Sequence, residues 1–315
     1  MDMYPLFIEI FQIGLVLLAA PLLAGWVRVL KCWMQGRTSP GLFQPYRNLR
    51  KLFMKDTMLA ENASWIFRFT PYLVFSSILM AGAIIPVVSA DLPLSASADI
   101  IALVALFGIA RFFLALAGMD IGTAFGGMGS SREMMISSLA EPAILMSTFT
   151  VSLFTHTTSL SEMVRIIVHK QFFLSPSMVF VFIAFTLIML AETGRVPVDN
   201  PATHLELTMI HEGMALEYSG RYLALIEWAG MMRLFVFSTL GVALFIPWGI
   251  AAGDGPAYLP VALLLMAGKL AAAGFGVVLA ETGMAKMRIF RVPEFLGTAF
   301  LIATLGMLSH FILEQ

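Results

Sequence analysis

The sequence predicts an all-α protein that crosses a membrane several times. Hydrophobic residues make up 59% of the 315 residues and charged residues 12%, whereas an ordinary soluble domain has about 25% charged residues. The apolar residues form long continuous runs, while membrane β-strands would alternate over segments of about ten residues. This composition excludes a soluble enzyme, and we expect a single membrane domain over residues 1–315.

Eight segments are long and apolar enough to cross a bilayer, because a transmembrane helix needs roughly 20 mostly apolar residues. Five contain no charged residue, and the other three enclose Arg111, Glu141 and Lys269 respectively. In chain order the eight predicted spans are 10–27, 69–90, 98–119, 134–155, 171–191, 234–253, 256–280 and 295–313.

Lysine and arginine are distributed unevenly between the two sets of connecting segments. The connections on the side of residues 28–68, counted with Arg111 in the span next to one of them, account for sixteen of the 19 basic residues, and the opposite side holds only Arg165 and Lys170. Cytoplasmic loops of membrane proteins carry an excess of Lys and Arg. We therefore expect residues 28–68 to be cytoplasmic and both termini to lie on the outer side.

A basic amphipathic segment, residues 43–56, lies in the first cytoplasmic connection. Its apolar residues recur at spacings of three and four, with basic residues between them. This pattern predicts a helix that lies in the membrane interface. It could anchor the chain to anionic lipid. It could instead form a ledge on which a soluble partner docks, with Arg47, Arg50 and Lys51 as contacts.

Three charged residues fall inside predicted spans. An isolated ion at the middle of a span costs roughly 2.5–3.5 kcal/mol on insertion scales, and such residues usually face a bundle interior or water. Glu141 has the opposite charge to Arg111 and Lys269 and could pair with either. The residues form either a structural ion pair or part of a route for ions or protons.

The connection over residues 191–233 is rich in carboxylates. Glu206 and Glu217 are eleven residues apart, close to three helical turns, so both would face one way in a helix. Carboxylates along a helix that enters the bilayer can pass protons, because burial and like-charge neighbours raise their pKa values. A plain solvated loop is the alternative, and it fits poorly because Glu217 and Glu227 run into the next span.

Short motifs add little chemistry of their own. LAETG occurs at 190–194 and at 279–283, and each copy ends a span, which two similarly terminated helices would explain. The glycine-rich stretch 126–133 lacks the third glycine of a dinucleotide loop and joins two membrane helices. The single cysteine, Cys32, excludes cysteine-ligated iron–sulfur and zinc sites. Any redox chemistry would belong to partners.

The acidic connection resembles a known family. AETGRVPVDNPATHLEL with LEYSGRYLALIEWA is similar to the membrane subunit of formate hydrogenlyase-type group 4 [NiFe] hydrogenases, hydrogenases 3 and 4. These subunits are relatives of subunit 1 of respiratory complex I, the NADH:quinone oxidoreductase. The resemblance continues in GLFQPYRNLRKLFMKD, in GGMGSSREMM and in ETGMAKMRIFRVPEFLG. It therefore covers most of the chain.

The resemblance implies an eight-helix subunit of a bacterial inner membrane, with periplasmic termini and no catalytic centre, cofactor or metal of its own. It implies soluble [NiFe]-hydrogenase large and small subunits and an iron–sulfur subunit as partners, which would carry the [NiFe] centre and the clusters. Antiporter-like membrane subunits would lie beside it. The expected role is anchoring and proton or conformational coupling. A net charge of −1 gives no reason to expect nucleic acid.

The resemblance also suggests which residues serve the coupling. The matching loop positions include Arg195 and Pro197, and Tyr218 follows them; we count Arg195 with the docking residues. Together with the charges inside the predicted spans and the other carboxylates of the acidic connection, the candidates for a proton relay are Arg111, Glu141, Glu192, Asp199, Glu206, Glu212, Glu217, Glu227 and Lys269.

Two other functions remain open. The first is a quinone-chamber subunit of an NADH:quinone oxidoreductase, but there the stretch after the aspartate is typically acid-rich, whereas here it reads NPATHLE. This difference favours the hydrogenase branch. The second is a stand-alone ion transporter, which would often show inverted repeats and broken helices. Beyond the LAETG repeat the sequence shows neither.

Overall fold

The computed structural model describes residues 3–89, 93, 99–169, 175–199, 210–250 and 258–313, and within them the chain is helical. Seven described helices are long and apolar enough to cross a membrane, and α7 is a shorter apolar helix. The predicted all-α fold with about eight spans is confirmed. The elements are α1 (Met3–Met34), α2 (Gln44–Phe53), α3 (Trp65–Ile84), α4 (Ile100–Asp120), α5 (Ala124–Thr155), α6 (Leu160–His169), α7 (Pro176–Glu192), α8 (His211–Ala215), α9 (Gly220–Phe245), α10 (Leu259–Gly283), η4 (Ile289–Arg291) and α11 (Val292–Leu313).

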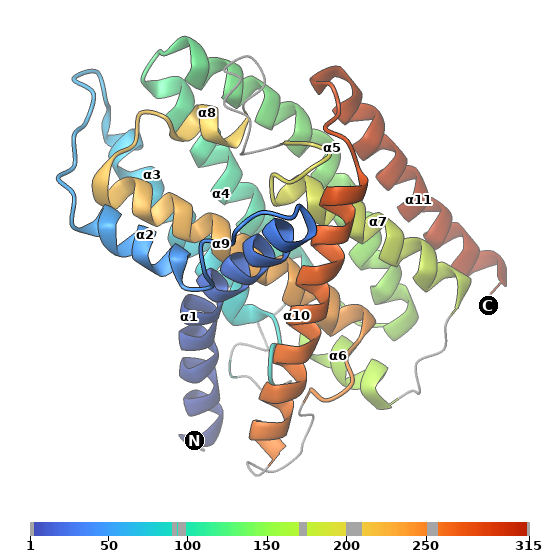
Figure 1. Ribbon diagram of the computed structural model, residues 1–315. Helices are drawn as coiled ribbons and strands as arrows, with labels where there is room; N and C mark the ends of the chain where they lie inside the picture. Colours follow the sequence, from blue (N-terminus) through green and yellow to red (C-terminus); the bar gives the residue numbers. More distant parts are fainter. Residues whose placement is uncertain are drawn as a thin grey trace.

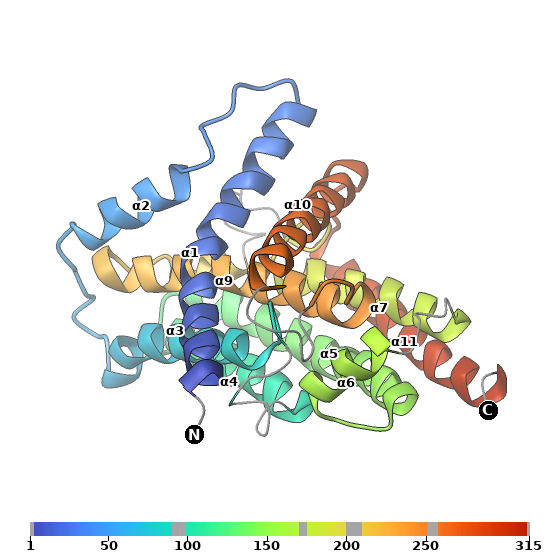
Figure 2. The same ribbon diagram turned by 90° about the horizontal axis from the view of Figure 1, so that it is seen from below.

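The helices form three layers around α9. Figure 2 shows α1, α2 and α10 on one side of α9, and α3, α4 and α5 on the other. Helix α9 is the most enclosed of the seven long apolar helices, since 78% of its most apolar segment is buried. Its neighbours in contact include α1, α3 and α7. A helix that is apolar all round belongs in such a core.

One face of the bundle collects α8, the α4–α5 turn and the start of α11, which lie together at the top of Figure 1. We call this the loop face. The N-terminus, α6 and the start of α10 lie toward the opposite face. Helices α5 and α11 therefore run away from the loop face, whereas α4 and α7 run toward it.

Side-chain caps begin three of the membrane helices. Ser64 accepts a hydrogen bond from the backbone N–H of Ile66 at 3.1 Å, and Asp99 accepts one from Ile101 at 3.2 Å. Thr123 caps α5 in the same way by accepting from Gly126 at 3.3 Å. Such caps satisfy backbone donors that have no partner within the helix, so these helix starts are encoded locally.

Two helices begin well before the predicted spans. Helix α9 begins at Gly220 rather than at 234, so part of the predicted acidic loop is helical. Helix α5 begins at Ala124, so the glycine-rich stretch 126–133 is helical and not a connecting loop. A Cβ atom on Gly126 would lie 2.2 Å from the carbonyl oxygen of Gly118 on α4. The glycines thus permit close helix packing.

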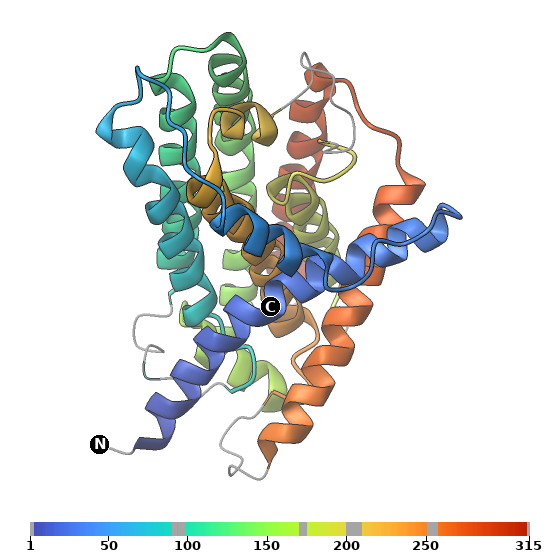
Figure 3. The same cartoon turned by 60° about the vertical axis from the view of Figure 1, so that its left-hand side comes forward.

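The amphipathic helix predicted for 43–56 is confirmed as α2. Pro45 and Leu49 are its buried residues, and α2 contacts α1 and α9. Tyr46 donates its hydroxyl to the carbonyl of Leu18 on α1. Figure 3 shows α2 lying across the bundle rather than along it. The apolar side of α2 is therefore packed against the protein.

Candidate functional site

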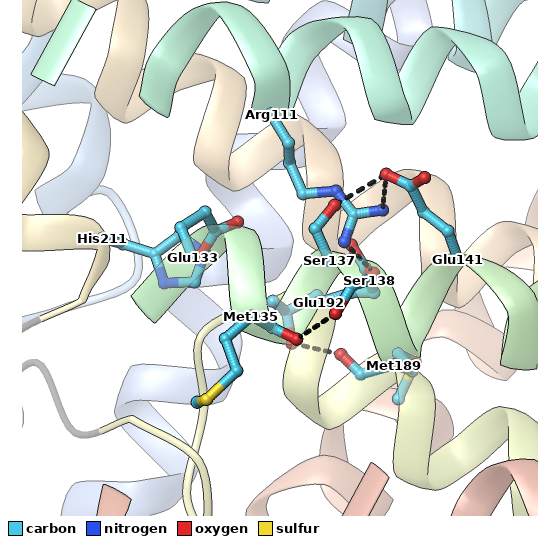
Figure 4. A network of polar contacts seen from close by, with 10 residues as sticks. Arg111, Glu133, Met135, Ser137, Ser138, Glu141, Met189, Glu192 and His211 are labelled. Carbon is cyan, nitrogen blue, oxygen red and sulfur yellow. Dashed lines mark hydrogen bonds and ion pairs between the residues drawn. The ribbon is translucent and has the colours of Figure 1, made fainter. Parts of the chain in front are cut away.

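Arg111 lies at the centre of a buried ion-pair cluster formed by α4, α5 and α7 (Figure 4). Its Nη1 donates to Glu192 Oε1 at 2.5 Å, and its Nη2 donates to Glu141 Oε1 at 3.3 Å. Ser137 donates its hydroxyl to the same Glu141 oxygen at 2.7 Å. Only 2% of Arg111 and 3% of Glu192 are exposed. Two partners were predicted for Glu141, Arg111 and Lys269. The structure places Arg111 beside Glu141, and Arg111 also pairs with Glu192.

Each helix contributes to this cluster in a specific way. Glu192 is the last residue of α7, and Glu141 follows Ser137 by one turn of α5. A Cβ atom on Gly108, about one turn before Arg111, would lie 3.4 Å from Glu141 Oε1, an ordinary van der Waals contact, so the carboxylate lies directly against α4. A planar guanidinium can hold two carboxylates by charge-assisted hydrogen bonds, which offsets the cost of burying Arg111.

A second polar cluster lies nearer the loop face, around His211 at the start of α8. His211 Nε2 is 3.4 Å from Glu133 Oε2, and Nδ1 is 3.8 Å from Asp199 Oδ2. Lys286 Nζ is 3.9 Å from Asp199 Oδ1. Burial lowers the pKa of His211. The carboxylates of Glu133 and Asp199 raise it by more than burial lowers it, so the pKa lies above the usual value for histidine.

The two clusters share helix α5. Glu133 precedes Glu141 by eight residues, so the two are about 12 Å apart along the helix axis. Arg233 of α9 is also buried and interacts electrostatically with both Glu133 and Glu192. The prediction missed Glu133 and Arg233 as site residues. Glu133, Ser137 and Glu141 repeat at intervals of four, and this single polar stripe on an apolar helix was the available signal.

A third cluster joins α1 to α10. Glu281 accepts from Lys31 Nζ at 2.7 Å through Oε2 and from Arg195 Nη1 at 2.6 Å through Oε1. Glu281 and Glu192 are the glutamates of the two LAETG repeats, and both are buried and paired with cations. The repeat therefore ends two helices and places a buried carboxylate at each end. Arg195, predicted as a docking residue, is engaged inside the protein.

A polar cavity of about 450 Å³ lies beside Glu281, between α1, α2, α9 and α10. Three cationic and three carboxylate side chains line it together with apolar side chains, so it could accommodate a ligand that has both polar and apolar parts. Glu212 and Glu227, both predicted as site residues, line it rather than the Arg111 cluster. Its charged lining residues are Arg28, Lys31, Arg195, Glu212, Glu227 and Glu281.

Two further predicted residues, Lys269 and Glu217, lie away from the Arg111 cluster. Lys269 donates to the carbonyls of Ile246, at 2.6 Å, and Trp248, just after α9. Glu217 is exposed in the turn before α9. Glu206 lies outside the described residues, so its predicted alignment with Glu217 has no structural account.

Tyr218 is a structural residue. Its ring stacks on Phe67 with 3.8 Å between centroids, and its hydroxyl donates to the Phe67 carbonyl at 3.0 Å. Burial raises the pKa of Tyr218 far above its usual value. The hydroxyl therefore stays protonated and acts as a fixed donor.

The predicted docking residues of α2 are available at the surface. Arg47, Arg50 and Lys51 are exposed, and Phe53 and Met54 beside them are exposed as well. Aromatic residues, Met and Arg are the side chains enriched in protein interfaces. This surface has the composition of a contact with a partner.

Ionisable side chains lie from Asp199 and His211 at the loop face to Glu141 within the bundle, and Arg233 interacts electrostatically with both clusters. Among the described residues, no three His, Cys, Asp or Glu side chains are placed to hold a metal ion.

Comparison with known proteins identifies relatives along nearly the whole chain. A family model described as NADH dehydrogenase matches residues 8–312. The chain is 32% identical to formate hydrogenlyase subunit 4 of Escherichia coli K12, over 94% of this chain and 96% of the relative. It is 30% identical to hydrogenase-4 component C of the same organism, over 97% and 96% of the two chains.

Similarity extends to quinone-linked enzymes and to a solved complex. NADH-quinone oxidoreductase subunit 8 of Rhodothermus marinus is 26% identical, over 74% of this chain and 70% of that protein. A chain of the membrane-bound sulfane sulfur reductase, an archaeal respiratory membrane complex, superposes with a TM-score of 0.83 at 17% identity. That alignment covers 95% of this chain and 97% of the other, which establishes a shared fold.

Proposed function

Because the chain belongs to the NADH dehydrogenase family, we propose that it is the membrane subunit of a hydrogen-evolving [NiFe]-hydrogenase complex of formate hydrogenlyase type. Its roles are to anchor the soluble subunits and to couple their reaction to proton movement. Almost full-length similarity to formate hydrogenlyase subunit 4 and hydrogenase-4 component C supports this branch. The [NiFe] centre and the iron–sulfur clusters would lie on partner subunits, since one cysteine cannot supply their ligands.

The Arg111–Glu192–Glu141 cluster, in which Arg111 and Glu192 are buried and Glu141 is partly exposed, is the observation that carries the coupling role. Three ionisable side chains from three helices meet where burial of charge is costly. Together with Glu133 and His211 they extend from the loop face into the bundle. Such a series can exchange protons with antiporter-like neighbours, or change its pairing when the soluble subunits turn over.

The exposed basic surface of α2 supports attachment of the soluble hydrogenase subunits. With the basic residues concentrated on the loop face, we place that face in the cytoplasm of a bacterial inner membrane. Affinity purification of the tagged chain from native membranes tests the partners. We expect [NiFe]-hydrogenase and iron–sulfur subunits and hydrogen evolution in the eluate. An assembled eluate without hydrogenase subunits would contradict the proposal.

Substitution of Glu192 tests the coupling role. Glu192→Gln keeps the shape of the side chain but removes its charge and its exchangeable proton, so proton movement per hydrogen evolved should fall by at least about tenfold. The assay is proton movement into membrane vesicles during hydrogen evolution. Glu61→Gln, at an exposed position, is the control and should behave as wild type. Wild-type coupling in Glu192→Gln would refute the role of this cluster.

The polar cavity favours one alternative, a quinone-binding subunit of an NADH:quinone oxidoreductase. A cavity of about 450 Å³ with charged and apolar walls suits an amphipathic head group. Quinone-site inhibitors discriminate between the two functions. They should leave hydrogen evolution by the purified complex unchanged, whereas inhibition together with copurified NADH dehydrogenase subunits would establish the alternative.

A further inference from the structure

His211 bridges two carboxylates that come from different parts of the fold. Nε2 faces Glu133 of α5 at 3.4 Å, and Nδ1 faces Asp199, which follows α7, at 3.8 Å. Both separations exceed the usual hydrogen-bond length. Among the described residues, neither His211 Nδ1 nor Glu133 Oε2 has a hydrogen-bond partner. The ring therefore lies between two carboxylates and forms a hydrogen bond to neither of them.

The imidazole is also the most exposed of these three side chains, although its Nδ1 atom is buried. Of the His211 side chain 24% is exposed, against 2% for Glu133 and 8% for Asp199. Figure 4 shows Glu133 beside the ring, and Glu133 is the more buried of the two side chains. Protons that reach Glu133 from the loop face along this group therefore meet His211 first.

Backbone packing fixes the position of the ring. Gly194 has φ +61°, and a Cβ atom there would lie 2.9 Å from His211 Nδ1. Gly129 of α5 approaches the residue before α8 so closely that a Cβ atom would be 2.9 Å from the Ile210 carbonyl oxygen. Larger residues at either position would displace α8, so the fold makes room for the imidazole against Glu133.

We propose that His211 is the proton entry group of the complex, which takes protons at the loop face and passes them to the buried Glu133. The step rests on the proton-coupling role proposed above. A proton reaches the buried Nδ1 through the carboxylate of Asp199, which lies beside it, and gives the imidazolium. The Nε2 proton then transfers to Glu133, which leaves a neutral ring and a protonated carboxyl group. Exchange between the two tautomers resets the ring.

Several charged groups act on His211 and set its titration. Glu133 of α5 and Asp199 after α7 favour the imidazolium, while Arg233 of α9 opposes it. Glu192 of α7 interacts with His211 electrostatically, and Lys286 after α10 is paired with Asp199. With the net pKa above the usual 6.5 or so, the imidazolium fraction, and proton delivery with it, should decline as the pH rises above that value.

The test measures protons moved per turnover in vesicles that contain the assembled complex, across a range of pH. His211→Gln can hydrogen-bond but cannot become protonated at these pH values, so the ratio should fall at least about tenfold and the alkaline decline should disappear. His310→Gln, in the last turn of α11, is the matched histidine control and should retain wild-type behaviour. A wild-type ratio and pH profile in His211→Gln would overturn the proposal.

A second variant tests the proposal if the His211→Gln complex does not assemble. Asp199→Asn removes one carboxylate that raises the pKa of His211, so the alkaline decline should move to lower pH. An unchanged decline would overturn the proposal. Failure of the underlying coupling role is distinguishable, because wild-type vesicles themselves would then move no protons during turnover.

Discussion

At the scale of single residues, compensation of buried charge explains the site. Arg111, Glu192 and Glu281 are each buried, and each is paired with at least one group of opposite charge. Breaking a buried pair by removing one partner costs about 3–5 kcal/mol, whereas replacing both partners by apolar residues is often neutral. Each pair therefore requires both partners to be kept together, although the pair as a whole adds little to the stability of the fold.

Arg111→Leu should destabilise the protein strongly. It leaves the carboxylate of Glu192 buried without its closest cation, and we expect a loss of about 3–5 kcal/mol. The double variant Arg111→Leu with Glu192→Leu should recover part of this loss, because the uncompensated charge is removed. The measurement is the denaturant midpoint of the purified chain in detergent. Equal midpoints for wild type and the single variant would contradict this account.

At the scale of elements, small residues decide how closely α5 approaches its neighbours. Gly126 packs against the backbone of α4, and Gly129 packs against the segment that leads into α8. Gly118 of α4 makes the reciprocal approach, since a Cβ atom there would lie 2.5 Å from the hydroxyl oxygen of Ser130. This packing brings Glu133 to His211.

Gly126→Ala and Gly127→Ala should have opposite effects. A Cβ atom at 126 would meet a backbone oxygen at 2.2 Å, whereas one at 127 meets nothing within 4 Å. We expect Gly126→Ala to cost about 1–3 kcal/mol through overpacking, and Gly127→Ala to stabilise α5 by up to about 1 kcal/mol through helix propensity. Denaturant midpoints in detergent test this pair. The close contact would be irrelevant if both variants changed stability alike.

At the scale of the whole molecule, the distribution of basic residues predicts the orientation in the membrane. Sixteen of the 19 lysines and arginines were assigned to one side from the sequence, and fourteen remain when Arg111 and Arg233, which are buried in α4 and α9, are left out. Such a bias sets the topology of most membrane proteins. An even number of spans then places both termini on the opposite, periplasmic side. Helix α2 and the His211 cluster would face the cytoplasm, where soluble partners and protons are available.

Reporter fusions at the two termini test the orientation. A reporter that is active only in the periplasm should be active at both ends of the chain, and one that is active only in the cytoplasm should be silent at both. Insertion of the cytoplasmic reporter after Gly36, in the turn that follows α1, provides the positive control. Opposite results at the two termini would show an odd number of spans.

The sequence by itself determined the number and approximate position of the membrane helices, the amphipathic α2 and the family. These properties are local: hydrophobic length decides whether a segment can span, and the spacing of apolar residues decides whether a helix has an apolar face. Arg111 and Glu141 were recognisable as a candidate ion pair for the same reason, because an isolated charge in an apolar run needs a partner.

Only the tertiary structure decided which charges meet. Arg111 and Glu192 are 81 residues apart, and Lys31 and Glu281 are 250 residues apart. Glu133 and Arg233 looked like loop residues because they carry charge, yet both are buried in helices that continue past the predicted boundaries. Partner side chains from other helices compensate their charges there. Since pairing depends on how the helices pack, no local pattern in the sequence could specify it.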